Sequence, residues 1–431
     1  MLIEFSVENF KSFRDRTTFS MIAANIKSAE ERLDTENTIP ISDDLSLLTS
    51  AAIYGKNASG KSNLGAALRF MRDMVLYSSS ILRPLNPETL EDELPTEPFL
   101  LNAKTRQQPS FFEIVFLLDG TQYRYGFEAD ATHIVSEWLF YVPSRREYAL
   151  FIREGQEISV KSNFKEGKGL EEKTRDVALF LSVVAQFNGA TAGKIIGWFG
   201  RLTITSGLQD DDFRTFTVRC LREGRHKDEI VSFVRSLDVD IDDLLVRPAA
   251  SLDDFPETPP GERRRRLADQ WNNEIIALHP IYGEAGERMG VEGFSADLQE
   301  SQGTRKLIAM AGPLHEALRH GYVLFIDEMD ARLHTHMTAA IVGLFNSRRT
   351  NPHGAQLIFV THDTNLLDNT LLRRDQIWFA EKDRQGGTRL ISLVEYRERN
   401  NADFEQRYLA GRYGGLPSVG DLSAVTGAAH G

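Results

Sequence analysis

Hydrophobic and polar residues alternate along two stretches of the chain, and this spacing predicts β-strands because successive side chains of a strand point to opposite faces. The first stretch is residues 1–20, where Ile3, Phe5 and Val7 alternate with polar residues. The second is residues 111–160, where the runs FFEIVFLL and TQYRYGFEA flank Asp119-Gly120, a dipeptide typical of hairpin turns. The second stretch is expected to hold about five strands and to form an antiparallel β lobe.

Helical spacing dominates other parts of the chain. From Ser62, apolar residues recur along one helical face for about four turns. Residues 171–245 also have helical periodicity, and a basic helix is expected from Arg263 to about Leu278. From about residue 294, helical and strand-like patterns alternate again. We therefore expect an α/β fold, a mixed sheet flanked by helices, in three parts: 1–163, a helical insertion at 164–293, and 294–431.

Residues 55–62, GKNASGKS, match the pattern G-x-x-x-x-G-K-[ST] between a short apolar strand and the helix that starts near Ser62. Backbone N–H groups of such a loop, together with the helix N-terminus, bind phosphate. Lys61 is expected to reach the β- and γ-phosphates, and the Ser62 hydroxyl to ligate Mg²⁺. A glycine-rich turn that binds nothing is the alternative. The residues expected to contact the nucleotide are Gly55, Lys56, Asn57, Ala58, Ser59, Gly60, Lys61, Ser62 and Asn63.

Two further apolar runs have the character of buried parallel strands, and each ends in polar residues. Residues 322–326 lead into Asp327-Glu328, where Asp327 is suited to hold Mg²⁺ and Glu328 to act as a general base on water. Residues 356–360 lead to His362, which is placed to sense the γ-phosphate. The alternatives are that His362 is a structural residue, as a lone histidine at a strand end usually is, and that Asp327-Glu328 is an ordinary acidic turn after a strand.

The spacing of these motifs narrows the class of nucleotide-binding protein. Lys61 and Asp327 are 266 residues apart, which excludes compact small GTPases and nucleotide kinases. The chain has no Asn-Lys-x-Asp motif for guanine, which favours ATP. Ser301-Gln302-Gly303 precedes an apolar helical face and offers a second phosphate-binding geometry. A single nucleotide site does not need two phosphate-binding segments. We therefore expect a head-to-tail homodimer, or a higher homo-oligomer, in which Ser301 and Gly303 of one copy cap the nucleotide of the other. An ordinary serine N-cap is the alternative.

The order GKNASGKS, ESQGTRK, VLFIDEMDARLH and LIFVTHD resembles the ABC-type ATPase heads of the SMC, RecF and OLD proteins. More narrowly, the opening FSVENFKSF, the segment FEIVFLLDGTQYRYGFE and the ending YLAGRYGGLP resemble bacterial RloA-like AAA family ATPases, which are related to the ATPases of the Septu, PARIS and AbiL phage-defence systems. The resemblance covers residues 1–163 and about 294–420. It implies an ABC-type ATPase head that dimerises around Mg-ATP.

The resemblance also assigns roles to particular residues. Asp327 and Glu328 match Walker B, and His362 matches the switch histidine. The residues that match Walker A are Gly55, Asn57, Gly60, Lys61 and Ser62. Ser301 and Gly303 match the signature motif, although ESQGT departs from LSGGQ. Lys11, in NFKS, is a further candidate for nucleotide contact. The implied catalytic residues are Lys61, Glu328 and His362. No glutamine has the defining context of the Q-loop; the candidates are Gln107, Gln108 and Gln122.

Composition bears on the partners. Fifty Lys and Arg against 62 Asp and Glu give a net charge of −12, which disfavours coating of nucleic acid through bulk positive charge but leaves a local patch open. The arginines at 263–266 are one such patch, or a solvated helix face. The single cysteine, Cys220, excludes an internal disulfide and a Cys-rich zinc site and fits a cytoplasmic location. No run reaches the roughly 18 apolar residues of a membrane span, so no membrane partner is expected.

Three functions follow from these observations. The first is an ATPase whose hydrolysis controls a separate effector protein, a nuclease or toxin, in antiphage defence, because no effector chemistry is visible in this chain. The second is a DNA-repair ATPase of the RecF or SMC kind, which predicts DNA-stimulated and salt-dependent turnover. The third is a nucleotide-gated scaffold with negligible turnover.

Overall fold

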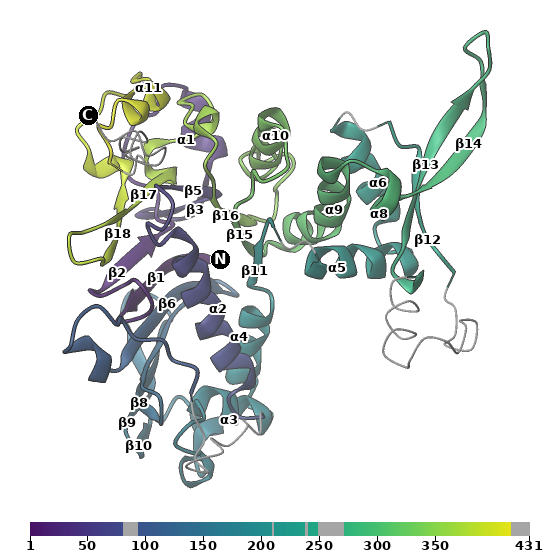
Figure 1. Cartoon of the computed structure of the whole chain (residues 1–431). Helices are drawn as coiled ribbons and strands as arrows, with labels where there is room; N and C mark the ends of the chain where they lie inside the picture. The colour runs from purple at the N-terminus through teal and green to yellow at the C-terminus, as the bar shows by residue number, and fades with distance from the viewer. Residues whose placement is uncertain (81–93, 209–210, 238–239, 249–270, 415–431) are drawn as a thin grey trace, which may run out of the picture. The chain divides into compact units, whose positions relative to one another are not determined.

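The computed structural model describes residues 1–80, 94–208, 211–237, 240–248 and 271–414. The chain divides into two compact units, coloured by residue number in Figure 1. The first unit is Met1–Ile204 with Val323–Asp327 and Gln356–Gly431, and the second is Thr205–Tyr322 with Glu328–Ala355. Each unit is therefore assembled from segments that are far apart in the sequence. Among the described residues, no helix is both long and apolar enough to cross a membrane.

A seven-stranded antiparallel sheet forms the β lobe of the first unit. Its strand order is β10-β9-β8-β7-β6-β1-β2. The strands are β1 (Leu2–Glu8), β2 (Thr17–Ser20), β6 (Ser110–Leu118), β7 (Thr121–Ala129), β8 (Ile134–Val142), β9 (Tyr148–Glu154) and β10 (Glu157–Val160). Asp119 and Gly120 form the two-residue turn between β6 and β7 with φ of 50° and 76°, the positive values that such a turn requires. The five strands expected in 111–160 are thus confirmed.

A second, mixed sheet of six strands positions the phosphate loop. Its order is β11-β15-β16-β5-β17-β18, in which β15, β16, β5 and β17 run parallel and β18 pairs antiparallel with β17. The strands are β11 (Thr203–Ser206), β15 (Val323–Asp327), β16 (Gln356–Val360), β5 (Ser50–Tyr54), β17 (Ile377–Lys382) and β18 (Thr388–Ser392). Every residue of β5 and β16 is buried, which explains their unbroken apolar character.

Helix α2 (Lys61–Tyr77) packs in the main core of the first unit. It buries Leu64, Leu68, Met71 and Val75, the face that the sequence spacing predicts. Gly65 lets it approach β15, because a Cβ at this position would lie 2.5 Å from the ring of Phe325. The other elements of this unit are α1 (Glu31–Glu36), β3 (Thr38–Ser42), β4 (Leu45–Leu48), α3 (Phe180–Gln186), α4 (Ala190–Gly200) and α11 (Phe404–Leu409).

The second unit combines helices with a three-stranded sheet of order β12-β13-β14. Its core is formed by apolar residues of α5, α6 and α9 together with β12 and β13. The elements are α5 (Asp211–Arg222), α6 (Lys227–Ser236), β12 (Asp243–Val246), β13 (Ile275–Tyr282), β14 (Arg288–Ser295), α8 (Ala296–Gln299), α9 (Gln302–His320) and α10 (Thr335–Phe345).

Helix α9 continues through Pro313, and a residue of α5 compensates for the missing N–H. Proline cannot donate to the carbonyl four residues earlier, here that of Ala309. The Thr217 hydroxyl donates to this carbonyl at 2.7 Å and accepts from the Gly312 N–H at 3.1 Å. The contact also explains Gly312, where a Cβ would lie 2.6 Å from the Thr217 oxygen.

The α/β fold with an antiparallel β lobe is confirmed, but one helix is not. The helix expected from Arg263 to about Leu278 is wrong over Ile275–Leu278, because these residues belong to strand β13, which pairs with β14. Ile275 and Ala277 are buried while Ile276 is half-buried, the two-residue alternation of a strand. The arginines at 263–266 lie outside the described residues. The segment 164–293 therefore holds strands as well as the expected helices.

Candidate nucleotide-binding site

Three strand ends meet at one edge of the mixed sheet in the first unit. Ile326 of β15 lies opposite Phe359 of β16, and Val360 of β16 lies opposite Ile53 of β5. Because these strands are parallel, their carboxyl ends lie at the same edge, where ligands bind in open α/β sheets. That edge carries the loop 55–62 after β5, Asp327 at the end of β15, and His362 after β16. The structure thus brings these sequence-predicted residues together.

The backbone of the phosphate loop requires its two motif glycines. Gly55 has φ of 153°, and a Cβ there would lie 2.4 Å from the carbonyl oxygen of Ala380. Gly60 has φ of 101°, and a Cβ there would lie 2.1 Å from the Thr388 hydroxyl. Both the conformation and the close approach exclude larger residues. The loop then runs directly into α2, whose first N–H groups lack helical partners and are available to an anion.

Lys61 is held against this loop. Its side chain is buried, with 5% of the residue exposed, and its Nζ donates to the carbonyls of Gly55 at 2.6 Å and Lys56 at 3.1 Å. Burying an ammonium without such bonds costs several kcal/mol. The loop carbonyls therefore hold the charge in place beside the backbone N–H groups that would surround a phosphate. Asn63 follows in the first turn of α2, and Ser62 is exposed there.

Asp327 has the environment expected of a cation ligand. Its Oδ1 is buried and has no hydrogen-bond partner in the described part of the chain. A buried acceptor left without a partner costs about 1–3 kcal/mol, and more when it is charged. A bound cation would remove this cost, and Mg²⁺ prefers oxygen ligands such as this carboxylate and the Ser62 hydroxyl. Ser59 Oγ, within the phosphate loop, is likewise buried without a partner in the described residues.

Two residues that sequence reasoning missed support the loop from behind. The Thr388 hydroxyl donates to the Ser59 carbonyl at 2.8 Å and lies 2.7 Å from the Ser12 hydroxyl. Ser12 in turn accepts from the Asn63 amide at 2.6 Å. The residues come from the turn after β1 and from the start of β18, so only the folded structure brings them to the loop.

Lys11 lies at a neighbouring cavity of about 540 Å³, which Ser12 and Asn63 also line. Its Nζ forms an ion pair with Glu97 at 2.8 Å, and its backbone has φ of 51°. Lys11 therefore lies beside the phosphate loop, bound to an acidic residue of the cavity wall.

The second unit contains Ser301, Gly303 and Glu328. Ser301 is the N-cap of α9, and its hydroxyl accepts from the Thr304 N–H at 3.1 Å. A Cβ at Gly303 would lie 2.9 Å from the Arg332 carbonyl oxygen, so the glycine permits a close approach of the loop after Glu328. Within one copy, both residues thus have a local structural role. Ser301 is exposed.

Glu328 directly follows Asp327 and has a left-handed backbone with φ of 51°. Its loop is fixed by Lys306 of α9, a fully buried lysine that sequence reasoning missed. Lys306 Nζ donates to the carbonyls of Met329 at 2.9 Å and Ala331 at 2.6 Å and lies 3.5 Å from that of Glu328. The sequence does contain one indication that Lys306 is buried: it lies four residues before Met310, on the same face of the helix as the buried positions of α9.

His362 is exposed after β16. The adjoining Asp363 is fixed by two hydrogen bonds, one from its N–H to the Thr361 hydroxyl at 3.0 Å and one from the Tyr54 hydroxyl to its carbonyl at 3.2 Å. The backbone that carries His362 is therefore anchored to β5, the strand that leads into the phosphate loop.

Residues 50–368 match the family model described as "AAA domain, putative AbiEii toxin, Type IV TA system". The chain belongs to this AAA family. The match begins at the first residue of β5 and includes the phosphate loop, Asp327 and His362. No curated protein matches the chain.

Among solved structures, the AAA family chain is similar to the SMC head domain from Thermotoga maritima, at 12% identity with a TM-score of 0.39, covering 91% of this chain and 98% of that one. It is also similar to an SmcHead bound to the C-winged helix domain of ScpA, at 13% identity with a TM-score of 0.40, covering 92% and 99%.

Proposed function

We propose that this chain is an ATPase that binds Mg-ATP at Gly55–Ser62. One observation carries the proposal: a buried lysine and a buried carboxylate oxygen that has no partner among the described residues lie at the same edge of a parallel sheet, beside a loop whose glycines have positive φ and close neighbours. Phosphate binding alone would explain the loop and Lys61. The oxygen of Asp327, which has no partner among the described residues, additionally favours a metal-bound triphosphate.

Each residue has a proposed role. Lys61 binds the β- and γ-phosphates in place of the loop carbonyls that it now contacts, and Ser62 and Asp327 hold the metal. Mg²⁺, when bound, neutralises charge that develops on the phosphates. Glu328 orients and deprotonates the attacking water, and His362 contacts the γ-phosphate.

We propose that hydrolysis takes place in a head-to-tail homodimer. Ser301 and Gly303 of one copy would then cap the nucleotide of the other. The exposed Ser301 at the N-terminus of a 19-residue helix supports this role, because such an end presents N–H groups and a positive dipole to an anion. Because ESQGT departs from the LSGGQ signature, Ser301 and Gly303 are the two positions of this segment that match it.

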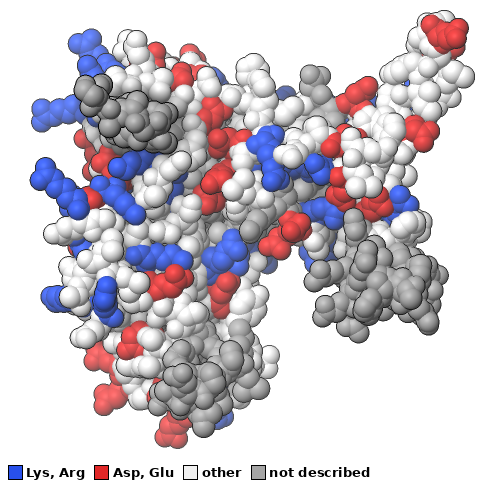
Figure 2. Space-filling view, in the orientation of Figure 1, with Lys and Arg blue, Asp and Glu red and all other residues white. Residues whose placement is uncertain are grey.

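The proposed biological role is control of a separate effector protein in antiphage defence. The RloA-like resemblance of the opening, the β lobe and the end of the chain supports it, and the family description names a toxin of a type IV system. Figure 2 shows Lys and Arg interspersed with Asp and Glu on the visible face of each unit, with both signs present on both. Together with the net charge of −12, this favours a protein partner over nucleic acid.

Steady-state ATP hydrolysis by the wild type, Glu328→Gln and Glu292→Gln tests the assignment. Glu292 is an exposed residue of β14, so its variant is a control for loss of one negative charge. Glu328→Gln is expected to lose most of the turnover while still binding ATP, and the control to hydrolyse normally. Equal rates for all three proteins would show that Glu328 is not the base.

Light scattering tests the dimer. Glu328→Gln with Mg-ATP should have twice the mass of the nucleotide-free protein, and Glu328→Gln combined with Ser301→Arg should remain a monomer. A monomer at saturating ATP in both proteins would refute the head-to-tail arrangement and leave nucleotide binding intact. Stimulation of turnover by DNA would favour the RecF-like alternative.

A further inference from the structure

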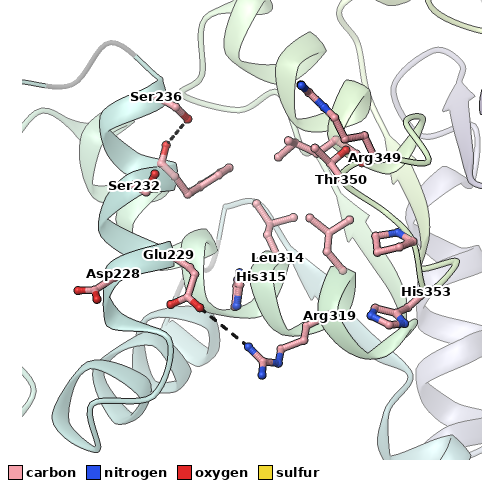
Figure 3. Close-up of a pocket in the computed structure, with 14 residues that line it drawn as sticks. Asp228, Glu229, Ser232, Ser236, Leu314, His315, Arg319, Arg349, Thr350 and His353 are labelled. Carbon is pink, nitrogen blue, oxygen red and sulfur yellow. Dashed lines mark hydrogen bonds and ion pairs between the residues drawn. The ribbon is translucent and has the colours of Figure 1, made fainter.

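Three residues with metal-binding side chains meet where α6 packs against α9 in the second unit. His226 is the N-cap of α6, Glu229 lies in its first turn, and His315 lies in α9. One potential ligand atom of each lies within 4.8 Å of those of the other two. Figure 3 shows Glu229, His315 and the neighbouring Arg319 converging at one side of a pocket. This cluster has no part in the proposed ATP site.

His315 supplies the first argument for a ligand. Its Nε2 is buried and has no hydrogen-bond partner among the described residues, so a polar atom at the α6–α9 contact lacks the bond that buried nitrogens normally have. Burial, helped by the nearby His226, lowers the pKa of the ring below its ordinary value. An imidazole nitrogen left without a partner in this way is available as a metal ligand.

Arg319 supplies the second argument, because it shows that the cluster attracts a cation. Its Nη1 lies 3.1 Å from Nδ1 of His226 and 3.9 Å from Oε1 of Glu229. An arginine can only donate, so Nδ1 of His226 is the acceptor and directs its lone pair at the guanidinium of Arg319, the position that a competing cation would take. The side chain of Arg319 is about half exposed, so it is able to swing into solvent when another cation takes its place.

We propose that His226, Glu229 and His315 form a binding site for a divalent transition metal, with Zn²⁺ as the best match, which ties α6 to α9. Two imidazoles and one carboxylate with an open fourth position are a common donor set for this ion. Tetrahedral ligands at about 2.1 Å from zinc lie about 3.4 Å apart, so atoms that lie up to 4.8 Å apart here must approach by up to about 1.4 Å. Glu229 is half exposed and has the freedom to make this movement.

The neighbouring pocket gives the ion access. Its volume is about 620 Å³, and Glu229, His315 and Arg319 line it together with apolar residues such as Phe233 and Leu314. A water or a small ligand in this pocket would occupy the fourth position. The bound ion would restrain α9, the helix that begins next to Ser301, and so would stabilise the second unit against local opening.

The experiment uses the untagged full chain, stripped with chelator and titrated calorimetrically with Zn²⁺; Co²⁺ serves as a spectroscopic probe of tetrahedral geometry. We expect one Zn²⁺ per chain. Glu229→Gln and His226→Gln should weaken binding by more than about tenfold, since loss of even an outer-shell partner costs about 10–100-fold. Arg319→Gln should strengthen it, because the competing charge is gone. His353→Gln, which alters a histidine of the same pocket outside the cluster, is the control.

Both replaced ligands lie at the surface or at a helix cap, so the thermal transition of each variant will verify that it folds. Absence of stoichiometric binding to the wild type would overturn the proposal. Binding of wild-type strength in both Glu229→Gln and His226→Gln would also overturn it, as would weaker binding in Arg319→Gln. These readouts do not depend on ATP hydrolysis, so the metal site and the proposed function fail separately.

Discussion

Replacing Lys306 by methionine removes a buried charge while nearly preserving the volume of the side chain. The lysine is fully buried in α9, and two of its bonds, to the carbonyls of Met329 and Ala331, are 2.9 Å and 2.6 Å long. A hydrogen bond to a charged group contributes about 1.5–3 kcal/mol to stability, so loss of the two bonds alone would lower the free energy of unfolding by about 3–6 kcal/mol. Relief of the desolvation of the ammonium offsets part of it, and we expect a net loss of about 2–3 kcal/mol.

The same substitution should affect catalysis through the position of Glu328, because Lys306 fixes the loop that follows this residue. A displacement of about 1 Å of a catalytic group costs as much as 10²-fold in rate. We therefore expect Lys306→Met to lower ATP turnover by about 10–100-fold and to leave ATP affinity almost unchanged, since the phosphate loop belongs to the other unit.

The assays are urea denaturation, ATP binding and steady-state hydrolysis. The matched control is Lys227→Met, which removes a partly exposed ion pair to Asp243 at 2.7 Å in the same unit and should cost about 1 kcal/mol or less. Wild-type stability and wild-type turnover in Lys306→Met would refute the reasoning. An equal loss of ATP affinity and turnover would show that the lysine acts on binding and not on Glu328.

Three further predictions concern packing and the phosphate loop. Thr388→Val removes the hydroxyl that supports this loop and should weaken ATP binding about 5–10-fold in a fluorescence titration, the equivalent of one hydrogen bond; unchanged affinity would exclude the support. Thr217→Val should lower the free energy of unfolding by about 1–3 kcal/mol, because the carbonyl of Ala309 loses its donor. The same substitution should cost less in a Pro313→Ala background, where the alanine restores an N–H for that carbonyl. Additive effects of the two substitutions in a double-mutant cycle would contradict the compensation. Gly65→Ala should cost about 1–3 kcal/mol in thermal or urea unfolding, because its Cβ would lie 2.5 Å from a ring of β15, and a neutral effect would show that this ring moves aside.

Local patterns predicted much of the fold and the elements that form the candidate nucleotide site. The phosphate loop, the strands that end at Asp327 and before His362, and the Asp119-Gly120 turn each depend on residues close together in sequence, where periodicity and turn chemistry act directly. Parallel pairing then places their ends at one edge of the sheet. These elements were found because local preference and tertiary structure agree.

The features that were missed depend on distant parts of the chain. Thr388 lies in an ordinary strand, and only the folded sheet brings its hydroxyl to the loop 329 residues earlier. The sequence predicts helix over part of strand β13 because the preceding arginines suggest one, whereas pairing with β12 and β14 decides its structure. Lys306 resembles a surface lysine in the sequence, and its three carbonyl neighbours come from a loop that follows the next strand.

The support of the phosphate loop by Ser12 and Thr388 has a consequence during synthesis of the protein. Gly55–Ser62 leaves the ribosome early, but one of its two supports is encoded more than three hundred codons later. A nascent or truncated chain that ends before β18 would lack the hydroxyl that fixes the Ser59 carbonyl. If the loop binds nucleotide as proposed, it would then reach its full affinity only once translation had passed β18, and the chain made before that point would bind more weakly.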